Sequence, residues 1–304
     1  MTAAQSPRLA PRLTPRLGRL VTAMVTPFAA DGSLDLGEAK RLAAYLVDRQ
    51  RMDALIINGT TGEAPTTSDQ EKRDLVAAVV AEVGDRAKVI AGVGTPDTRH
   101  TQELARQAEQ AGADGLLVVT PYYSRPPQDA LLAHFATVAD TTGLPILIYD
   151  IPSRTGQEVA ESTLIALGDH PNILGVKDAK GQVASSARVM AATGLDYYAG
   201  DDAMVLPLLA VGGVGLVGTS THFTGATSRL MIDAWLAGDT TGALEYYRQM
   251  LPVYTGVFAT QGVLLVKAGL AARGFTPGGV RAPLSPASPD QAAGFIALLD
   301  AAGL

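Results

Sequence analysis

The sequence predicts an α/β fold, a (β/α)8 (TIM) barrel followed by a C-terminal helical region. Short apolar runs rich in β-branched residues recur at intervals of roughly 25 to 35 residues, with a helix-period segment between successive runs. Most runs are continuously apolar rather than alternating, which is typical of parallel strands buried on both faces. There are eight such runs, and eight strand–helix units fit a closed barrel better than an open sheet.

The predicted strands are each bounded by Gly, Pro, Asn or Asp. They cover residues 21–28, 54–58, 88–93, 115–119, 145–150, 173–178, 197–200 and 215–218. The clearest helices between them cover residues 36–51, 68–83, 101–111 and 129–141. Ser68 is the expected N-cap of the second of these helices, and Glu71 completes a capping box.

After the eighth strand the strand–helix alternation ends, which defines the expected domain organisation. Helices are predicted over residues 228–236, 241–250, 261–272 and from Gln291 onward. We therefore expect a barrel over residues 18–226 and a helical region over residues 227–304, packed on the barrel because no Pro- or Ser-rich linker separates them. Residues 1–17 contain three Pro-Arg-Leu triplets, whose prolines oppose helix formation, and are expected to form a disordered basic tail.

The composition excludes several classes of protein. Among the 304 residues, 24 Lys and Arg face 30 Asp and Glu, and a net charge of −6 provides no electrostatic footprint for nucleic acid. The chain has no cysteine, so a reducing, cytoplasmic environment is expected, and it has no apolar run of about 20 residues that would cross a membrane. The scattered histidines lack metal-ligand spacing, so no metal is predicted; they are His100, His134, His170 and His222.

Barrel active sites form at the C-terminal ends of the strands, where Lys177 closes an apolar run. Burial of a charged lysine is costly, so its pKa should fall, and a neutral lysine amine is a Schiff-base nucleophile. A structural lysine paired with Asp178 is the alternative, and the strand end alone leaves both open. Lys267 also has apolar neighbours, but it lies at helical spacing, where its charged end is expected to reach solvent.

Other strand ends carry groups that suit a carbonyl substrate. Gly59-Thr60-Thr61-Gly62 offers backbone N–H groups and hydroxyls for a carboxylate or phosphate, or is merely a turn. Tyr123 and Tyr149 have phenols that can exchange protons with a carbonyl oxygen, although tyrosines at strand ends more often serve packing. Arg154 suits a substrate carboxylate, or else a surface ion pair.

Three other features of the sequence do not indicate a functional site in their context. Residues 213–218 match the dinucleotide-binding pattern G-x-G-x-x-G, but they lead into a strand rather than follow one. Asp201-Asp202 is interpreted as an N-cap for a helix from Ala203. Ser153 and Ser220 have no nucleophile-elbow setting, which disfavours a serine hydrolase.

Five strand-end segments together resemble the dihydrodipicolinate synthase and N-acetylneuraminate lyase family. The resemblance extends from about Gly18 to the C-terminus, in matching order. The segments that carry it are Gly59-Thr60-Thr61-Gly62-Glu63, Thr120-Pro121-Tyr122-Tyr123-Ser124-Arg125-Pro126, Tyr149-Asp150-Ile151-Pro152-Ser153-Arg154-Thr155-Gly156, Gly175-Val176-Lys177-Asp178 and Gly200-Asp201-Asp202. The segment around Arg154 resembles the dihydrodipicolinate synthase branch in particular.

The resemblance implies a lyase-class reaction without metal or other cofactor. Lys177 would form a Schiff base with pyruvate, whose enamine attacks the aldehyde of L-aspartate semialdehyde on the route to diaminopimelate and lysine. Tyr149, Thr60 and Tyr123 would form a proton relay, with Tyr123 reaching across from a neighbouring subunit. The family is typically a homotetramer.

The resemblance also implies how substrates bind. The Thr61 hydroxyl and the loop amides, including that of Gly62, would hold the pyruvate carboxylate. Arg154 would bind the semialdehyde carboxylate. The backbone of Gly200 and Val217 would line the pyruvate pocket.

Two departures from the family pattern stand out. Residues 218–223 are unlike the small, apolar sequence that the family commonly has there. In lysine-inhibited members a pocket at the dimer interface uses Ser, His, Asn and Glu side chains, where this chain has Ala64, Asp69, Pro96 and His100. Weak or absent lysine feedback is therefore predicted.

Two other functions remain as alternatives. A sister aldolase with the same Lys177 chemistry would act on a 2-keto-3-deoxy sugar acid or 4-hydroxy-2-oxoglutarate, and Arg154 argues against it. A keto-acid-binding barrel without turnover is the more remote alternative.

Overall fold

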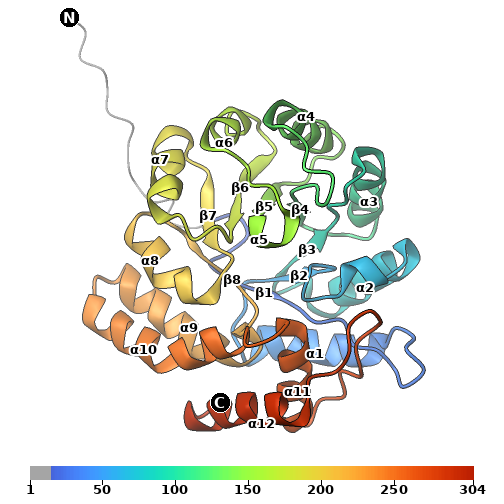
Figure 1. The fold of residues 1–304 in the computed structure, drawn as a ribbon, viewed down its shortest axis with the longest axis vertical. Helices are drawn as coiled ribbons and strands as arrows, with labels where there is room; N and C mark the ends of the chain where they lie inside the picture. Colours follow the sequence, from blue (N-terminus) through green and yellow to red (C-terminus); the bar gives the residue numbers. More distant parts are fainter. Residues whose placement is uncertain (1–14) are drawn as a thin grey trace, which may run out of the picture.

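The structure, a computed structural model, describes residues 15–304 and contains a closed barrel of eight parallel strands (Figure 1). The strands pair in sequence order, and β8 pairs with β1 to close the ring. They are β1 (Leu20–Ala23), β2 (Ala54–Ile57), β3 (Lys88–Gly92), β4 (Gly115–Val119), β5 (Ile146–Asp150), β6 (Ile173–Asp178), β7 (Asp196–Ala199) and β8 (Gly215–Gly218). The predicted (β/α)8 fold is confirmed.

One predicted strand is too long. Residues 21–28 were expected to form a single strand, but β1 ends at Ala23 and only the Met24 N–H continues toward β2, donating to the Ile56 carbonyl. Pro27 has no N–H for a ladder. Phe28 turns away instead, and its N–H donates to the carbonyl of Pro277 in the C-terminal region.

Helices surround the barrel (Figure 1). They are α1 (Leu36–Asp48), α2 (Asp69–Val83), α3 (Thr98–Gln110), α4 (Gln128–Ala139), α6 (Glu161–Leu167), α7 (Val183–Thr193), α8 (Val205–Ala210) and α9 (Thr221–Leu236), with the single turn α5 (Pro152–Thr155) and the 3-10 turns η1 (Ala64–Thr66) and η2 (Asp202–Met204). The predicted Ser68–Glu71 capping box is present at the start of α2. Helix α3 begins at Thr98, three residues before the predicted start, because the Asp97 side chain caps it by accepting from the Arg99 N–H.

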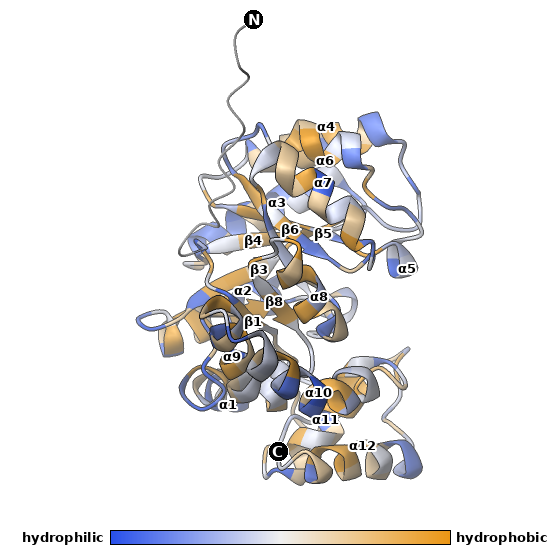
Figure 2. Ribbon diagram, turned by 90° about the vertical axis from the view of Figure 1, so that its left-hand side faces the viewer, coloured by the Kyte–Doolittle hydropathy of each residue, from blue (hydrophilic) through white to orange (hydrophobic). Residues whose placement is uncertain are grey.

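The helical region does not begin where the sequence predicts. Helix α9 follows β8 directly, so the expected boundary between residues 226 and 227 falls inside a continuous helix. Its first half is the eighth helix of the barrel; there Gly225 lies against Met52 and Gln50, with no room for a Cβ. The remaining helices are α10 (Thr240–Gly256), α11 (Gly262–Ala272) and α12 (Pro289–Ala301). Figure 2 shows α11 and α12 together at one end of the molecule.

None of the helices in the described part of the chain combines the length and apolar character that a membrane crossing requires. The cytoplasmic location stays a prediction of the sequence.

Apolar side chains form a shell between strands and helices and a second cluster inside the barrel. Leu17 belongs to the inner cluster and is 2% exposed. Residues 1–14 of the expected basic tail lie outside the described residues. The expected end of the tail at residue 17 is therefore wrong, because Leu17 is part of the barrel interior.

This burial predicts the effect of shortening Leu17. Leu17→Ala should lower the free energy of unfolding by about 2–4 kcal/mol, because it removes buried methyl groups and leaves a cavity. Leu230→Ala is the control: Leu230 is a leucine on α9 that is 43% exposed, and its change should stay within about 0.5 kcal/mol. Denaturant unfolding measures both, and equal effects would contradict the assignment of Leu17 to the core.

Candidate active site

Lys177 lies near the C-terminal end of β6 and is 4% exposed. In the register of β5 and β6 it is opposite Tyr149, and its Nζ lies 4.1 Å from the centroid of the Tyr149 ring. Burial lowers the pKa of Lys177 to about 8, with a smaller raising effect from the charge of Asp202 and a lowering effect from Arg154. The amine is therefore neutral in an appreciable fraction of molecules near neutral pH.

The alternative of a structural ion pair with Asp178 is wrong. The Asp178 carboxylate accepts from the backbone N–H of Lys180, 2.8 Å away, and from the hydroxyl of Ser186. Within residues 15–304, Lys177 makes no ion pair. A carboxylate in contact would have stabilised the ammonium form, so the lack of one leaves a nucleophile.

A cavity of about 210 Å³ lies above Lys177. It is lined by six of the nine residues to which the resemblance assigns a catalytic or binding role: Thr60, Thr61, Tyr149, Arg154, Lys177 and Gly200. It also contains residues that no motif indicated, among them Thr219, Phe258, Gln261 and Gly262. The last three come from the end of α10 and the start of α11, which no local sequence signal connects to the barrel mouth.

Of the two residues expected to line the pyruvate pocket, Gly200 lines the cavity above Lys177 and Val217 does not. A Cβ on Gly200 would lie 3.0 Å from the Lys177 side chain and 3.1 Å from the Asp178 carbonyl, so any larger residue would press on the lysine where it enters the cavity. Val217 is buried in the barrel interior beneath the cavity and is not among its lining residues.

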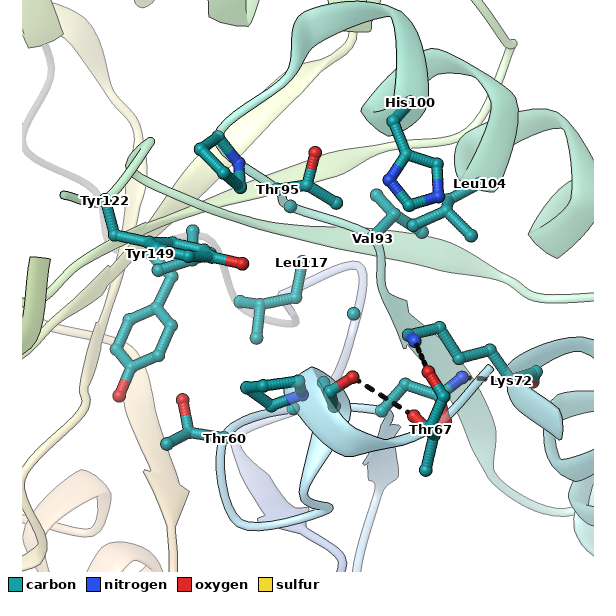
Figure 3. Close-up of a pocket in the computed structure, with 18 of the residues that line it drawn as sticks. Thr60, Thr67, Lys72, Val93, Thr95, His100, Leu104, Leu117, Tyr122 and Tyr149 are labelled. Atoms are coloured by element: carbon teal, nitrogen blue, oxygen red, sulfur yellow. Dashed lines mark hydrogen bonds between the residues drawn. The ribbon is translucent and has the colours of Figure 1, made fainter. Parts of the chain in front are cut away.

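Tyr149 is fully enclosed beside Lys177. Burial raises the pKa of its phenol to about 12, and the charge of Arg154 and a hydrogen bond with Thr60 act in the opposite direction. Figure 3 shows the side chains of Tyr149 and Thr60 pointing toward one another. The two hydroxyls can therefore pass a proton without introducing a charge that competes with the amine.

Tyr123 does not join them in the single chain. Its side chain is 95% exposed, its φ is 72°, and it does not line the cavity above Lys177. Its neighbour Tyr122 is half-buried and lines a different cavity, which adjoins this one. A role for Tyr123 requires a second subunit, as the resemblance implies, and stays a prediction.

The loop from Gly59 to Glu63 carries Thr60 and Thr61 into the site. The Gly62 carbonyl accepts from the Thr26 hydroxyl at 2.6 Å, and a Cβ on Gly62 would lie 3.2 Å from the Met24 carbonyl oxygen. Gly62 therefore shapes the loop from behind and is not itself a lining residue.

The prediction that the charged end of Lys267 reaches solvent is wrong. Its contacts instead explain how the loop from Gly59 to Glu63 is held. Its Nζ lies 2.8 Å from Glu63 Oε1, over the ring of Phe28 at 4.4 Å, and donates to the Gly279 carbonyl. Glu63 Oε2 accepts from the Arg281 N–H at 2.8 Å. The side chains of Lys267 and Glu63 are both buried, and the ion pair between them offsets part of the cost of removing each from water.

Arg154 lies at the rim of the cavity on α5. Its side chain is exposed, and it makes no ion pair within residues 15–304, so the surface ion pair considered from the sequence is not present. The guanidinium is free to bind a carboxylate from solvent.

A second cavity of about 420 Å³ adjoins the first and shares Thr60, Tyr149, Ile151 and Arg154 with it. It is lined by the positions at which the sequence departs from lysine-inhibited relatives: Ala64, Asp69, Pro96 and His100. Figure 3 shows His100 among the residues around this cavity. Asp69 and His100 pair with each other at 2.8 Å. Lys72 of α2 also lines this cavity and donates to the Thr67 carbonyl.

Asp201 and Asp202 each accept hydrogen bonds from backbone N–H groups of turns at the barrel mouth. Asp201 caps η2, as predicted, by accepting from the Ala203 N–H at 3.0 Å. Asp202 is fully buried and accepts instead from the turn after β8. No group of three or more His, Asp or Glu side chains that could hold a metal ion is found in residues 15–304.

Comparison with known proteins identifies the family. Residues 16–302 match the dihydrodipicolinate synthetase family. The chain belongs to this family. It is 59% identical over 283 residues to a 4-hydroxy-tetrahydrodipicolinate synthase from Cutibacterium acnes, covering 93% of this chain and 97% of that protein. It is 58% identical over 286 residues to one from Acidothermus cellulolyticus, covering 94% and 92%.

Solved structures of the dihydrodipicolinate synthetase family have the same fold. A dihydrodipicolinate synthase from Cyanidioschyzon merolae with lysine bound has a TM-score of 0.92 at 35% identity, covering 95% of this chain and 99% of that one. An Acinetobacter baumannii synthase in complex with pyruvate has a TM-score of 0.91 at 29% identity, covering 94% and 99%.

The buried amine predicts a pH dependence. The rate at which pyruvate and cyanoborohydride label Lys177 should rise about tenfold per pH unit below the pKa of about 8 and level off above it, because only the neutral amine attacks a ketone. Mass spectrometry of the labelled peptide measures the rate, and Lys177→Ala is the control. A rate that keeps rising to pH 10 would contradict the lowered pKa.

Proposed function

We propose that this chain is a 4-hydroxy-tetrahydrodipicolinate synthase that condenses pyruvate with L-aspartate semialdehyde through an imine on Lys177. The observation that carries the proposal is the buried Lys177 amine, which forms no ion pair with a carboxylate of residues 15–304 and faces a cavity with the Tyr149 and Thr60 hydroxyls. Family membership and relatives that bear this activity as their name support it.

The first half of the reaction activates pyruvate. The Lys177 Nζ attacks the ketone carbon, and loss of water gives a protonated imine. Tyr149 and Thr60 carry the protons that leave the amine and reach the departing oxygen. The methyl carbon of the bound pyruvate then loses a proton to give the enamine.

The second half joins the two substrates. The enamine carbon attacks the aldehyde carbon of the semialdehyde, and the aldehyde oxygen gains a proton to become a hydroxyl. The semialdehyde amine then attacks the imine carbon and displaces Lys177, which closes the ring and releases the product. The lysine itself supplies the electron sink, so the proposed steps use neither a metal nor an organic cofactor.

Substrate carboxylates have matching partners at the two sides of the cavity. The Thr61 hydroxyl and the backbone amides of Thr60 and Thr61 offer donors on the Lys177 side, where the pyruvate carboxylate would bind. Arg154 offers a guanidinium at the rim for the semialdehyde carboxylate. We propose that this arginine selects the semialdehyde over sugar acids.

A homotetramer completes the proposal. Tyr123 is a large aromatic residue that the single chain leaves 95% exposed, and its neighbour Tyr122 lines the second cavity. A neighbouring subunit would cover this tyrosine and receive its hydroxyl as the third member of the relay. Among the relatives of solved structure, one is described as a monomeric variant, so the oligomeric state needs its own measurement.

Arg154 provides the test of the activity. In a coupled assay, Arg154→Ala should lower kcat/KM for aspartate semialdehyde by about tenfold to a hundredfold, because a charge-assisted bidentate contact is lost. Labelling of Lys177 by pyruvate and cyanoborohydride should be unchanged when it is measured well above the Lys177 pKa of about 8, where loss of the Arg154 charge no longer alters the neutral fraction of the amine. Arg188→Ala, which removes an exposed arginine paired with Glu161, is the matched control.

The outcomes separate the alternatives. Faster turnover with a 2-keto-3-deoxy sugar acid or 4-hydroxy-2-oxoglutarate than with the semialdehyde would favour the sister aldolase. No labelling of Lys177 would leave a keto-acid-binding barrel. An unchanged semialdehyde reaction in Arg154→Ala would overturn the assignment of the second substrate.

Weak lysine feedback is a separate prediction. Ala64 and Pro96 offer no hydrogen-bonding side chain to an effector in the second cavity, and Asp69 and His100 already pair with each other. Loss of polar partners costs a polar ligand much of its affinity. Millimolar lysine should therefore leave the initial rate unchanged in the coupled assay, and strong inhibition at that concentration would contradict the prediction.

A further inference from the structure

Thr219 is a residue of the catalytic cavity to which sequence and family resemblance assign no role. It is the first residue after β8, it is 7% exposed, and it lines the cavity above Lys177. Its Oγ1 lies 3.3 Å from the Oγ1 of Thr61, across the cavity wall from one loop to another. It also belongs to residues 218–223, where the sequence departs from the family pattern.

The backbone of Thr219 is held from both sides. Its N–H donates to the buried carboxylate of Asp202 at 3.0 Å, and the next N–H, of Ser220, donates to the same carboxylate at 2.8 Å. Its carbonyl oxygen lies 2.8 Å from Nδ1 of His222. These bonds fix the position of the residue without involving its side chain.

His222 has a defined tautomer in this arrangement. A carbonyl oxygen can only accept and a backbone N–H can only donate, so Nδ1 carries the proton toward Thr219 and Nε2 accepts from Val25 N–H at 3.2 Å. Complete burial lowers the pKa of His222 to about 4, which keeps the ring neutral. The turn after β8 is therefore anchored to the segment after β1.

The side chain of Thr219 is oriented by the helix that packs over it. A Cβ on Gly262, at the start of α11, would lie 3.3 Å from the Thr219 methyl carbon, so the methyl group already fits closely against this glycine. With the methyl group on that side, the hydroxyl group faces Thr61.

We propose that Thr219 is a positioning residue for the keto-acid carboxylate, acting through the hydroxyl of Thr61. The inference rests on the proposed function, in which Thr61 donates to the carboxylate of pyruvate. When the Thr219 hydroxyl donates to Thr61 Oγ1, the Thr61 hydrogen is directed into the cavity and its donor strength increases through cooperativity. A carboxylate accepts hydrogen bonds only, so it selects this direction of the pair.

A purely structural role would give a different signature. Asp202 and His222 form their hydrogen bonds with the backbone of residue 219, so Thr219→Val keeps these bonds. The variant also keeps a branched side chain of nearly the same shape, in which a methyl group replaces the hydroxyl group. Thermal unfolding of the variant checks that the fold is retained.

The experiment compares Thr219→Val with Thr219→Ser in the full-length protein. Half-saturation by pyruvate is measured twice, as KM in the coupled assay and as the pyruvate concentration that gives half-maximal labelling of Lys177 with cyanoborohydride. Both values should rise about threefold to tenfold in Thr219→Val, the range expected for one hydrogen bond. KM for aspartate semialdehyde should not change, and Thr219→Ser should return both pyruvate values to within about twofold of the parent.

A double-mutant cycle tests that the effect passes through Thr61. In a Thr61→Val background, Thr219→Val should cause no further rise in pyruvate half-saturation, because its partner is already gone. The same rise in both backgrounds, an unchanged pyruvate value in Thr219→Val, or a shift in semialdehyde KM instead would each overturn the inference. Absence of labelling in the parent protein would overturn the proposed function, which is a separate observation made before any variant is compared.

Discussion

The site depends on one charged group that is taken out of water without a partner. Lys177 lies near the end of an apolar strand, and the side chains beneath it form the inner cluster of the barrel. The ammonium form therefore loses solvation, and no carboxylate among residues 15–304 forms an ion pair with it to replace that solvation. Alternation along the strand sends the next residue, Asp178, to the opposite face, where Ser186 binds its carboxylate. The alternation of side chains along β6 therefore places Lys177 in the cavity and keeps the Asp178 carboxylate away from its amine.

The C-terminal helices are part of this site rather than an attachment to the barrel. Glu63 lies buried at the end of the loop that carries Thr60 and Thr61, and a buried carboxylate needs compensation. Lys267 of α11 and the backbone of Arg281 provide it, and the Arg281 side chain and Lys267 lie against the ring of Phe28. The loop holds its shape because a segment more than 200 residues away in the sequence (the Glu63–Arg281 separation is 218) packs against it.

The sequence was sufficient wherever the signal is local. Apolar runs bounded by Gly and Pro located all eight strands, and the strand ends indicated Lys177, Tyr149 and Thr60 because barrel topology brings such ends together. The sequence does not predict that α9 continues from Thr221 to Leu236, because Gly225 and its small, polar neighbours resemble a loop. In the structure Met52 and Gln50 pack against Gly225.

The sequence was not sufficient where a residue's environment comes from distant parts of the chain. Lys267 looks like a surface lysine at helical spacing, and only the fold reveals that Glu63 lies opposite its Nζ. Thr219 carries no motif, and its place beside Thr61 follows from the closure of β8 onto β1. A buried, unpaired Lys177 also has to remain stable once it becomes a cationic imine. Asp202 makes this possible without contact: its carboxylate, held by the N–H groups of the turn after β8, favours positive charge on Nζ, yet desolvation of the amine outweighs it. The Lys177 amine is therefore neutral in enough molecules to attack the ketone, and the cationic imine that it forms is still stabilised by the charge of Asp202.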